Sequence, residues 1–329
     1  MRYSSQEKLE IIRLVESSHL GVQRTLAKLG VARPTFYRWY ARYQTHGEAG
    51  LKNHYRGPVR PWNGLPEEIR AKLLELALEA PELSPRELAV RFTHAQGYYV
   101  SESTVYRLLK AHDLITSPAF VVIKAANEYK DKTTGVNQLW QTDFTYFTYF
   151  KVLGWGWFYL CTILDDYSRY IIAWRLCTTM QAADVTQTLE VGLRISGCQG
   201  ARVGHKPRLL SDNGPCYISQ ELALWLKDQG MGHVRGAPNH PQTQGKIERW
   251  HQTLKNCVLL EHYHLPGELE QSVGEFVTYG NHQRYHESLN NLTPADVYFG
   301  RGESILEERR KIKEQTIHSR RLQHQLETV

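Results

Sequence analysis

The hydrophobic and polar positions of the first fifty residues follow the period of a helix. Residues 6–16, 21–29 and 33–39 each place apolar side chains three or four positions apart, and Gly30 marks the turn before the third segment. This order is the helix-turn-helix pattern, whose last helix enters the DNA major groove by its N-terminal residues. A plain three-helix bundle is the alternative. The residues that we expect to contact bases and phosphates are Arg33, Thr35, Tyr37 and Arg38.

The same pattern returns after residues 53–65, a stretch with two Pro and two Gly that indicates a linker. Residues 66–80 predict a helix. Ser84-Pro85-Arg86-Glu87 predicts the start of another, with Ser84 as N-cap and Glu87 completing a capping box. A candidate recognition helix then begins at Ser103, and two such units are harder to explain as plain bundles than one. The predicted DNA contacts here are Ser103, Thr104 and Arg107.

From about residue 121 the pattern changes to short apolar runs rich in aromatic and β-branched residues. These runs predict strands, and the amphipathic segments between them predict helices. Three consecutive strands followed by alternating helices and strands are typical of an α/β domain with a mixed sheet. The predicted strands are 138–147, 157–164, 170–176, 208–211 and 232–235, and the predicted helices are 181–196, 218–229 and 245–261.

Three carboxylates stand in or directly after these predicted elements. Asp143 interrupts an apolar strand, Asp212 ends another strand, and Glu248 lies on the long helix with 35 residues between it and Asp212. A buried charge is costly unless something pairs with it. Carboxylate oxygens suit Mg²⁺ or Mn²⁺, and two such ions about 4 Å apart activate an attacking oxygen and stabilise the leaving oxygen of a phosphodiester. We therefore interpret the three carboxylates as catalytic metal ligands.

The segments around these carboxylates resemble the motifs of a known family. Residues 237–255 (APNHPQTQGKIERWHQTLK) are similar to the glutamate motif of insertion-sequence transposases that share the retroviral-integrase core. Residues 210–214 (LSDNG) and 140–146 (WQTDFTY) resemble that family's second and first aspartate motifs, and residues 166–169 (DYSR) match a feature of its hairpin. The resemblance covers roughly residues 125–300.

The resemblance implies a ribonuclease-H-like core in which Asp143, Asp212 and Glu248 bind Mg²⁺ or Mn²⁺. It implies nicking of DNA at element ends, followed by attack of the freed 3′-hydroxyl on target DNA, without a covalent protein–DNA intermediate. The family also has a lysine in a position similar to Lys255. One departure from retroviral integrases is that the His-His-Cys-Cys zinc module is missing, and the helix-turn-helix units take its place.

Other polar residues of the long helix are candidates for DNA contact. Lys255 shares the helix face of Glu248 with His251 and Gln252, and Lys246 precedes Glu248 by two residues. We expect Lys246 and Lys255 to contact DNA phosphates. An ordinary solvated helix face is the alternative for the whole stripe.

Other polar residues favour structural roles. Asp165 and Asp166 are expected to cap the hairpin turn and to pair with Arg169. His282 and His286 stand four residues apart, but the sequence shows no third zinc ligand, so a structural or DNA-facing role is preferred.

Charge and cysteine content narrow the class of protein. The net charge is +6, and residues 1–60 hold eleven Lys/Arg against four Asp/Glu, which favours a polyanionic partner.

The five cysteines are odd in number, widely spaced and without CxxC, so neither a disulfide framework nor a cysteine zinc site is expected. No apolar run reaches the 18 or so residues of a membrane span, and no signal peptide is apparent, so we expect a cytoplasmic, nucleoid-associated protein.

Together these patterns predict all-α helix-turn-helix domains followed by an α/β ribonuclease-H-like core with a mixed sheet. The predicted function is a DNA transposase acting on double-stranded element ends and target DNA as a homodimer or higher oligomer. A catalytically silent DNA-binding regulator derived from a transposase and a ribonuclease-H-type nuclease are the alternatives. The predicted segments are 1–52 (first helix-turn-helix domain), 53–65 (linker), 66–120 (second helix-turn-helix domain), 121–300 (catalytic core) and 301–329 (charged, solvated tail or partner-binding helix).

Overall fold

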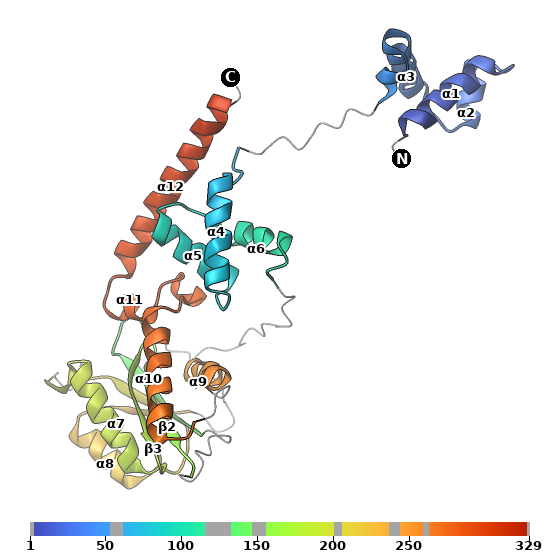
Figure 1. Ribbon diagram of the computed structural model, residues 1–329. Coiled ribbons are helices and arrows are strands. Elements are labelled where there is room, and N and C mark those ends of the chain that lie inside the picture. Colours follow the sequence, from blue (N-terminus) through green and yellow to red (C-terminus); the bar gives the residue numbers. More distant parts are fainter. Residues whose placement is uncertain are drawn as a thin grey trace. The chain divides into compact units, whose positions relative to one another are not determined.

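The chain divides into two compact units, Met1–Gly64 and Leu65–Val329. The computed structural model, drawn in Figure 1, describes residues 3–52, 62–115, 133–146, 156–200, 206–236, 244–258 and 263–327. The second helix-turn-helix region therefore groups with the α/β region. None of the helices in the described ranges is long and apolar enough to cross a membrane.

The first unit contains a helical domain with its own apolar core. Its first helix begins with a capping box, in which the Ser4 hydroxyl accepts from the Glu7 amide at 3.2 Å and the Glu7 carboxylate accepts from the Ser4 amide at 2.6 Å. Ile12 and Phe36 are buried at the centre of this core. The elements are α1 (Ser5–Ser17), α2 (Val22–Lys28), α3 (Arg33–His46) and the short 3₁₀ helix η1 (Gly47–Leu51).

The second helix-turn-helix domain opens the larger unit. Its predicted capping box is confirmed, because the Ser84 hydroxyl accepts from the Glu87 amide and the Glu87 carboxylate accepts from the Ser84 amide. Gly97 ends the middle helix in the left-handed conformation, with φ of 57°, which turns the chain toward the last helix. Phe92 and Val105 are buried in the core. The helices are α4 (Glu67–Glu79), α5 (Pro85–Gln96) and α6 (Glu102–Ala111).

A sheet with strand order β3-β2-β1-β4-β5 forms the centre of the α/β region. Strand β2 pairs antiparallel with both β1 and β3, whereas β4 pairs parallel with β1 and β5 pairs parallel with β4. The mixed sheet expected from the sequence is therefore confirmed. The strands are β1 (Leu139–Tyr146), β2 (Tyr159–Asp165), β3 (Ile171–Cys177), β4 (Arg208–Ser211) and β5 (His233–Arg235).

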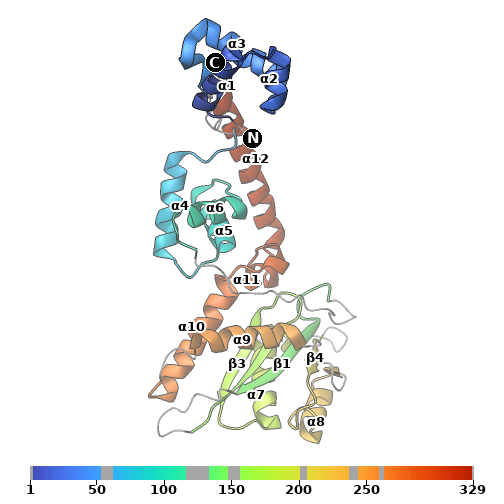
Figure 2. The same ribbon diagram turned by 90° about the vertical axis from the view of Figure 1, so that its right-hand side faces the viewer.

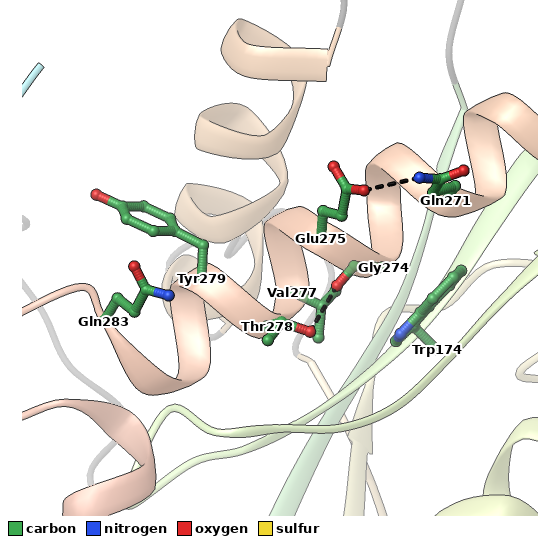
Figure 3. Close-up of a pocket in the computed structure, with 8 residues that line it drawn as sticks. All are labelled: Trp174, Gln271, Gly274, Glu275, Val277, Thr278, Tyr279 and Gln283. Carbon is green, nitrogen blue, oxygen red and sulfur yellow. Dashed lines mark hydrogen bonds between the residues drawn. The ribbon is translucent and has the colours of Figure 1, made fainter.

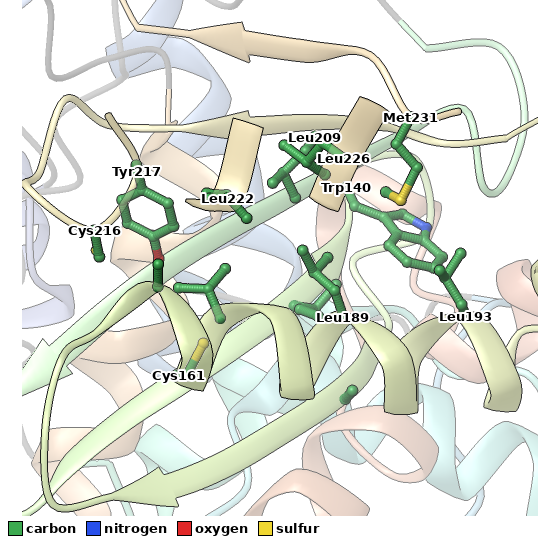
Figure 4. Packing of buried hydrophobic residues seen from close by; sticks show 14 of the residues in the cluster. Trp140, Cys161, Leu189, Leu193, Leu209, Cys216, Tyr217, Leu222, Leu226 and Met231 are labelled. Atoms are coloured by element: carbon green, nitrogen blue, oxygen red, sulfur yellow. The ribbon is translucent and has the colours of Figure 1, made fainter. Parts of the chain in front are cut away.

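Helices cover both faces of this sheet. On one face, α7 (Ala182–Ile195) and α8 (Gln220–Asp228) pack on a cluster that includes Trp140 and Leu209 (Figure 4). On the other, α9 (Gly245–Val258) and α10 (Pro266–His282) bury apolar residues against β2 and β3 (Figure 2). The sheet thus lies between two helical layers, which fixes the position of α9 relative to β1.

Strand β3 lies at one edge of the sheet, and a side chain of α10 covers part of that edge. The Asn281 amide oxygen accepts from the Ile171 backbone amide at 2.8 Å, and the Asn281 amide nitrogen donates to the Ile171 carbonyl at 3.0 Å. Asn281 is 4 % exposed. One asparagine therefore forms both hydrogen bonds that a neighbouring strand would offer to this residue.

The last part of the chain differs from the sequence-based expectation. Residues expected to form a solvated tail or a partner-binding helix make the long helix α12 (Gly302–Glu327), which packs against the second helix-turn-helix domain of the same chain. Thr316 of this helix is 4 % exposed. Polar and arginine side chains make many of the contacts, so the helix lacks the apolar stripe by which a packed helix is recognised in a sequence. The short elements of the same unit are η2 (Cys198–Gly200), η5 (Glu287–Leu289) and α11 (Pro294–Tyr298).

Candidate active site

Two of the predicted catalytic carboxylates lie on neighbouring parallel strands. Asp143 is in β1, and Asp212 directly follows β4. Gln141 and Leu210 are the last paired residues of the two strands, so continuing the register by two residues sets Asp143 beside Asp212. Adjacent strands are about 4.8 Å apart, and paired residues point to the same face. The fold therefore brings two residues that are 69 positions apart in the sequence side by side on the interior strands of the sheet.

The third carboxylate, Glu248, lies in the first turn of α9 and is exposed. Partial burial, and then the negative charge of Asp143, raise the pKa of Glu248 above its ordinary value. The shift shows that the two carboxyl groups are within electrostatic reach of each other. Asp143 and Asp212 likewise both act on the buried thiol of Cys216, where burial is the main cause that raises the pKa to about 11.

The start of α9 is fixed to the strands by a buried glutamine. The Gln244 amide nitrogen donates to the Thr142 carbonyl at 3.0 Å and to the Leu210 carbonyl at 3.3 Å. Thr142 is in β1 immediately before Asp143, and Leu210 is in β4 two residues before Asp212. Gln244 is 5 % exposed, so breaking these bonds would leave buried polar groups unsatisfied. One side chain thus sets the first turn of α9 against both carboxylate-bearing strands.

A second buried network holds the same turn from β1. The Gln141 side-chain oxygen accepts from the Ile247 backbone amide at 3.2 Å, and its nitrogen donates to an Asp166 carboxylate oxygen at 2.7 Å. The same carboxylate oxygen is 2.9 Å from the Lys246 ammonium, which also donates to the Asp166 carbonyl at 2.9 Å. The two residues that precede Glu248 are therefore both tied to this network, which limits where Glu248 can point.

His251, one turn beyond Glu248, faces the sheet and is 4 % exposed. Its Nδ1 is 3.4 Å from an Asp143 carboxylate oxygen, and its Nε2 is 3.2 Å from the Thr162 hydroxyl. The sequence placed His251 on a polar stripe with Gln252 and Lys255. The structure corrects this for His251, which is buried against the sheet, whereas Gln252 is exposed. His251 thus links the helix that carries Glu248 to Asp143.

Asp143 in β1, Asp212 after β4 and Glu248 in the first turn of α9 do not form a closed cage. In the parts of the chain that the structure describes, no three His, Cys, Asp or Glu side chains are grouped so that they could hold a metal ion. Asp212 is exposed and accepts from the Gly214 amide at 2.9 Å. Residues 237–243, the first part of the predicted glutamate motif, lie outside the described residues. The site is therefore an open group of acidic residues, of which Asp212 and Glu248 are exposed to solvent.

The predicted DNA-contacting residues of α3 lie mainly on its surface. Arg33, Tyr37 and Arg38 are exposed, and Thr35 is half-buried. The Arg33 guanidinium lies over the Tyr37 ring at 5.8 Å. Phe36, between them, points into the core. The helix therefore presents a basic, aromatic surface of the kind that contacts phosphates and base edges.

The corresponding residues of α6 are arranged similarly. Ser103 and Arg107 are exposed, and the Arg107 Nε donates to the Ser103 carbonyl at 3.0 Å. Thr104 is half-buried, and its hydroxyl is 2.8 Å from that of Ser101. Of these residues, Ser103 and Arg107 are the more accessible to a DNA groove.

Two lysines of α9 were also predicted to contact DNA. The Lys246 ammonium contacts both the carboxylate and the backbone carbonyl of Asp166, and these contacts hold the first turn of α9. Lys255 is half-buried one turn after His251. Asp165 caps the hairpin turn as expected, accepting from the Ser168 amide and hydroxyl at 2.8 and 2.6 Å. The Asp166 carboxylate is 2.9 Å from the Lys246 ammonium, a partner that was not expected.

A shallow hollow lies on the outer side of α10 and is separate from these residues (Figure 3). Trp174 of β3 and Glu275, Thr278 and Gln283 are among the side chains that line it. None of the predicted catalytic or DNA-contacting residues lines this hollow. The candidate chemistry therefore belongs to the carboxylates of β1, β4 and α9 and not to this hollow.

Comparison with protein families identifies the domains. Residues 133–241 match a family model described as the integrase core domain, and residues 229–294 match a second model with that description. Residues 7–58 match a helix-turn-helix domain, and residues 35–109 match a homeodomain-like domain. The matches cover the sheet, the three carboxylates and both helical regions.

Similar curated proteins are retroviral polyproteins. The Gag-Pro-Pol polyprotein of squirrel monkey retrovirus is 34 % identical over 122 residues, which is 37 % of this chain and 6 % of that protein. The Pol-related polyprotein of the mouse intracisternal A-particle MIA14 is 34 % identical over 135 residues, 41 % of this chain and 14 % of that protein. The chain therefore spans only a small part of the length of these relatives.

Solved structures that resemble the chain are integrases at low identity. A simian T-cell lymphotropic virus intasome, solved with PP2A regulatory subunit B56 gamma, is 16 % identical over 69 % of this chain and 74 % of its own, with a TM-score of 0.44. The HTLV-2 integrase catalytic core domain in complex with magnesium is 20 % identical over 51 % of this chain and 99 % of its own, with a TM-score of 0.38. The family models and the sheet topology together show that the chain carries an integrase core domain of ribonuclease-H-like fold, preceded by helix-turn-helix domains.

Proposed function

We propose that the chain is a DNA transposase that nicks DNA at element ends and joins the freed 3′-hydroxyl to target DNA, with Asp143, Asp212 and Glu248 as its catalytic carboxylates. The observation that supports the proposal is that Asp143 and Asp212 lie on neighbouring parallel strands of an integrase core domain, with the charge of Asp143 acting on Glu248. The helix-turn-helix domains, with their exposed arginines, supply the contacts to duplex DNA.

The chemistry of the donor set fits a hard divalent cation. All three proposed ligands are carboxylates, which Mg²⁺ and Mn²⁺ prefer. The negative charge of Asp143 raises the pKa of Glu248, and a bound cation would offset that repulsion. When bound, such ions supply an activated oxygen nucleophile and stabilise the leaving oxygen. A magnesium complex among the similar integrase cores is consistent with this choice of metal.

The residues of the chain hold the carboxylates and the DNA in place for two displacements. In the first, water attacks a phosphodiester, and the bond to the 3′-oxygen breaks as that oxygen takes a proton. In the second, the freed 3′-hydroxyl attacks a target phosphodiester and releases a target 3′-oxygen. Gln244, Gln141 and Lys246 keep the first turn of α9 on the strands during both steps, so that Glu248 stays beside Asp143.

A complete reaction requires two element ends to be held together, so we propose that the protein acts as a dimer or larger assembly on DNA. Similar HTLV-2 integrase cores were solved in dimeric and trimeric forms. Light scattering of the complex with end DNA tests this, and a strictly monomeric complex would contradict it.

The decisive experiment measures strand cleavage and joining on duplex DNA that carries the sequences flanking this gene, with Mg²⁺ or Mn²⁺. Asp212→Asn and Glu248→Gln should each lower product formation by more than about 100-fold, because each removes a ligand that contributes several kcal/mol to the transition state. Asp228→Asn and Glu221→Gln, exposed acidic residues of α8, are the matched controls and should retain activity.

Other outcomes point to the alternative functions. Specific DNA binding with no product in either metal, and biological activity unchanged by Glu248→Gln, would favour a DNA-binding regulator. Preferential cleavage of RNA–DNA hybrids over duplex DNA would favour a ribonuclease-H-type nuclease.

A further inference from the structure

Helix α12 runs along the second helix-turn-helix domain and contacts it at several points. The contacts involve Arg309, Thr316 and Arg320 of α12, which span about 16 Å of helix. On the other side they involve His94 of α5 and the Tyr98–Tyr99 segment between α5 and α6. This is a specific surface formed by residues more than 200 positions apart in the sequence.

The segment that leads into α6 is held at its backbone. The Tyr99 amide donates to the Thr316 hydroxyl at 3.0 Å, and the Tyr99 carbonyl accepts from the Arg320 guanidinium at 2.7 Å. The same guanidinium donates to the Tyr98 hydroxyl at 2.8 Å and lies over the Tyr98 ring at 4.8 Å. Tyr99 is two residues before the N-cap Ser101 of α6. The direction of the candidate recognition helix is thus set by α12.

A second set of contacts joins α5 to the turn after α10. The Arg309 Nε donates to His94 at 2.6 Å, and its Nη1 donates to the carbonyls of Asn290 and Asn291 at 3.2 and 2.9 Å. Burial and the nearby Arg309 charge lower the pKa of His94, so the ring is neutral and accepts this bond. Arg86 of α5 donates to the Asn291 side chain at 2.6 Å. Two arginines therefore bind one turn from opposite sides.

The Asn290–Asn291 turn is connected to the helical layer of α9 and α10, and α9 carries Glu248. It follows α10, whose Asn281 is bonded to the edge strand β3. The Phe276 ring of α10 lies 6.0 Å from the Trp250 ring of α9, two residues after Glu248. A chain of packed elements therefore leads from α6, through α12 and α10, to the carboxylates.

We infer that α12 and the Asn290–Asn291 turn hold the second helix-turn-helix domain and the catalytic core as one body, so that α6 determines which phosphodiester bond of the bound element end reaches the carboxylates. The inference rests on the proposed function and assigns the recognition of duplex DNA near the cleaved bond to the second domain. Ser103, Arg107 and Lys110 of α6 remain exposed for that contact. The first helix-turn-helix domain belongs to a separate compact unit, so its contacts add affinity and do not select the bond.

The experiment uses the full chain with the double substitution Thr316→Val and Arg320→Ala, and Arg310→Ala as control. Arg310 is on the same helix, and its exposed guanidinium pairs with Glu307. Cleaved end DNA is mapped at single-nucleotide resolution. The control should cut the wild-type bond, whereas the double variant should spread its cuts over several bonds and lose up to about 100-fold of correctly joined product. An unchanged single cut in the double variant would overturn the inference.

A footprint on end DNA gives a readout that does not need catalysis. Wild type should protect the site read by α6 and an adjoining segment covered by the core at a constant spacing, and the double variant should keep the first protection and lose the second. Equal footprints would overturn the inference even if wild type makes no product, which separates this failure from a failure of the proposed function.

Amide hydrogen exchange of the double variant distinguishes local detachment of α12 from unfolding of the whole unit. Only the peptide containing Tyr99 and the α12 peptides should exchange faster in the double variant, with the sheet unchanged. If the double variant unfolds, Tyr98→Phe with Thr316→Val removes two of the hydroxyl contacts more gently and is mapped in the same way.

Discussion

Residues 3–52 and residues 62–115 form domains with similar local construction and different connections to the rest of the chain. Each begins a helix with a serine capping box, at Ser4 and at Ser84, and each buries a phenylalanine, Phe36 or Phe92, at the centre of its core. The first nevertheless lies in a compact unit of its own, whereas the second groups with the integrase core. Local sequence therefore specifies the domain, and distant arginine and threonine contacts specify its connection to the core.

The largest expected effect comes from removing the two matched core phenylalanines. Phe36→Ala and Phe92→Ala should each cost about 3–5 kcal/mol, since both side chains are almost fully buried. In calorimetry of the full chain, Phe36→Ala should lower only the transition of the Met1–Gly64 unit. Phe92→Ala should lower the transition of the larger unit. A new low-temperature transition in Phe92→Ala, with the core transition unchanged, would show that the second domain folds independently.

Removing one exposed arginine from each recognition helix should have the next largest effect. Arg38→Ala and Arg107→Ala are each expected to weaken DNA binding by about 1–3 kcal/mol and, where the contact is to a phosphate, to reduce the salt dependence of binding by about one counterion. Only Arg107→Ala should also alter the position of cleavage, because α6 is held to the core. Binding titrations at several salt concentrations, with mapped cleavage, check this, and a cleavage shift in Arg38→Ala would contradict the comparison.

Removing the N-cap serine from each of the two capping boxes should have a smaller effect on stability, and the two variants form a matched pair. Ser4→Ala and Ser84→Ala should each cost about 1 kcal/mol. Because the enthalpy and entropy of unfolding scale with size, the melting temperature should fall by about 4–8 °C for the smaller unit and by at most about 2–4 °C for the larger one. Equal shifts would indicate that Ser84 belongs to a cooperative unit as small as that of Ser4.

Lowering the pH should slightly reduce the free energy of unfolding of the larger unit through His286. Burial, and then the charges of Arg284, Arg169 and Arg86, lower the pKa of His286 to about 3. The unfolded chain then binds a proton below pH 6.5 and the folded chain does not, so this contribution to stability is complete above pH 6.5 and is lost as pH falls toward 3. The two pKa values imply a loss of about 2 kcal/mol at pH 5, and solvent screening lowers this to about 1–2 kcal/mol. His286→Gln should abolish the loss in pH-dependent denaturation curves. An unchanged pH dependence in the variant would rule out this role.

Much of the fold could be predicted because it depends on local patterns. The capping box at Ser84, the strand that became β3 and the mixed sheet all follow from spacing and residue type. The packing of α12 could not be predicted in this way. Arg309, Thr316 and Arg320 contact backbone carbonyls, a backbone amide and aromatic rings, which leave no apolar period in the sequence.

In the candidate site, too, features that depend on local sequence could be predicted, and contacts between distant residues could not. The three carboxylates were identified from their motifs, and their roles as ligands stay a prediction. The partners of Asp166 could not be predicted, since Lys246 is 80 positions away and Arg169 is the nearer cation in the sequence. His251 was misplaced because helical spacing gives the relative positions of side chains but not which of them face the sheet.

The pair of bonds between Asn281 and Ile171 also limits how copies of the chain can associate. An unpaired edge strand invites a second molecule to extend the sheet by continuous backbone pairing, which is a common route to aggregation. At Ile171 the backbone amide and carbonyl are already occupied by the asparagine. A second copy could therefore not extend the sheet by continuous backbone pairing through Ile171 of β3.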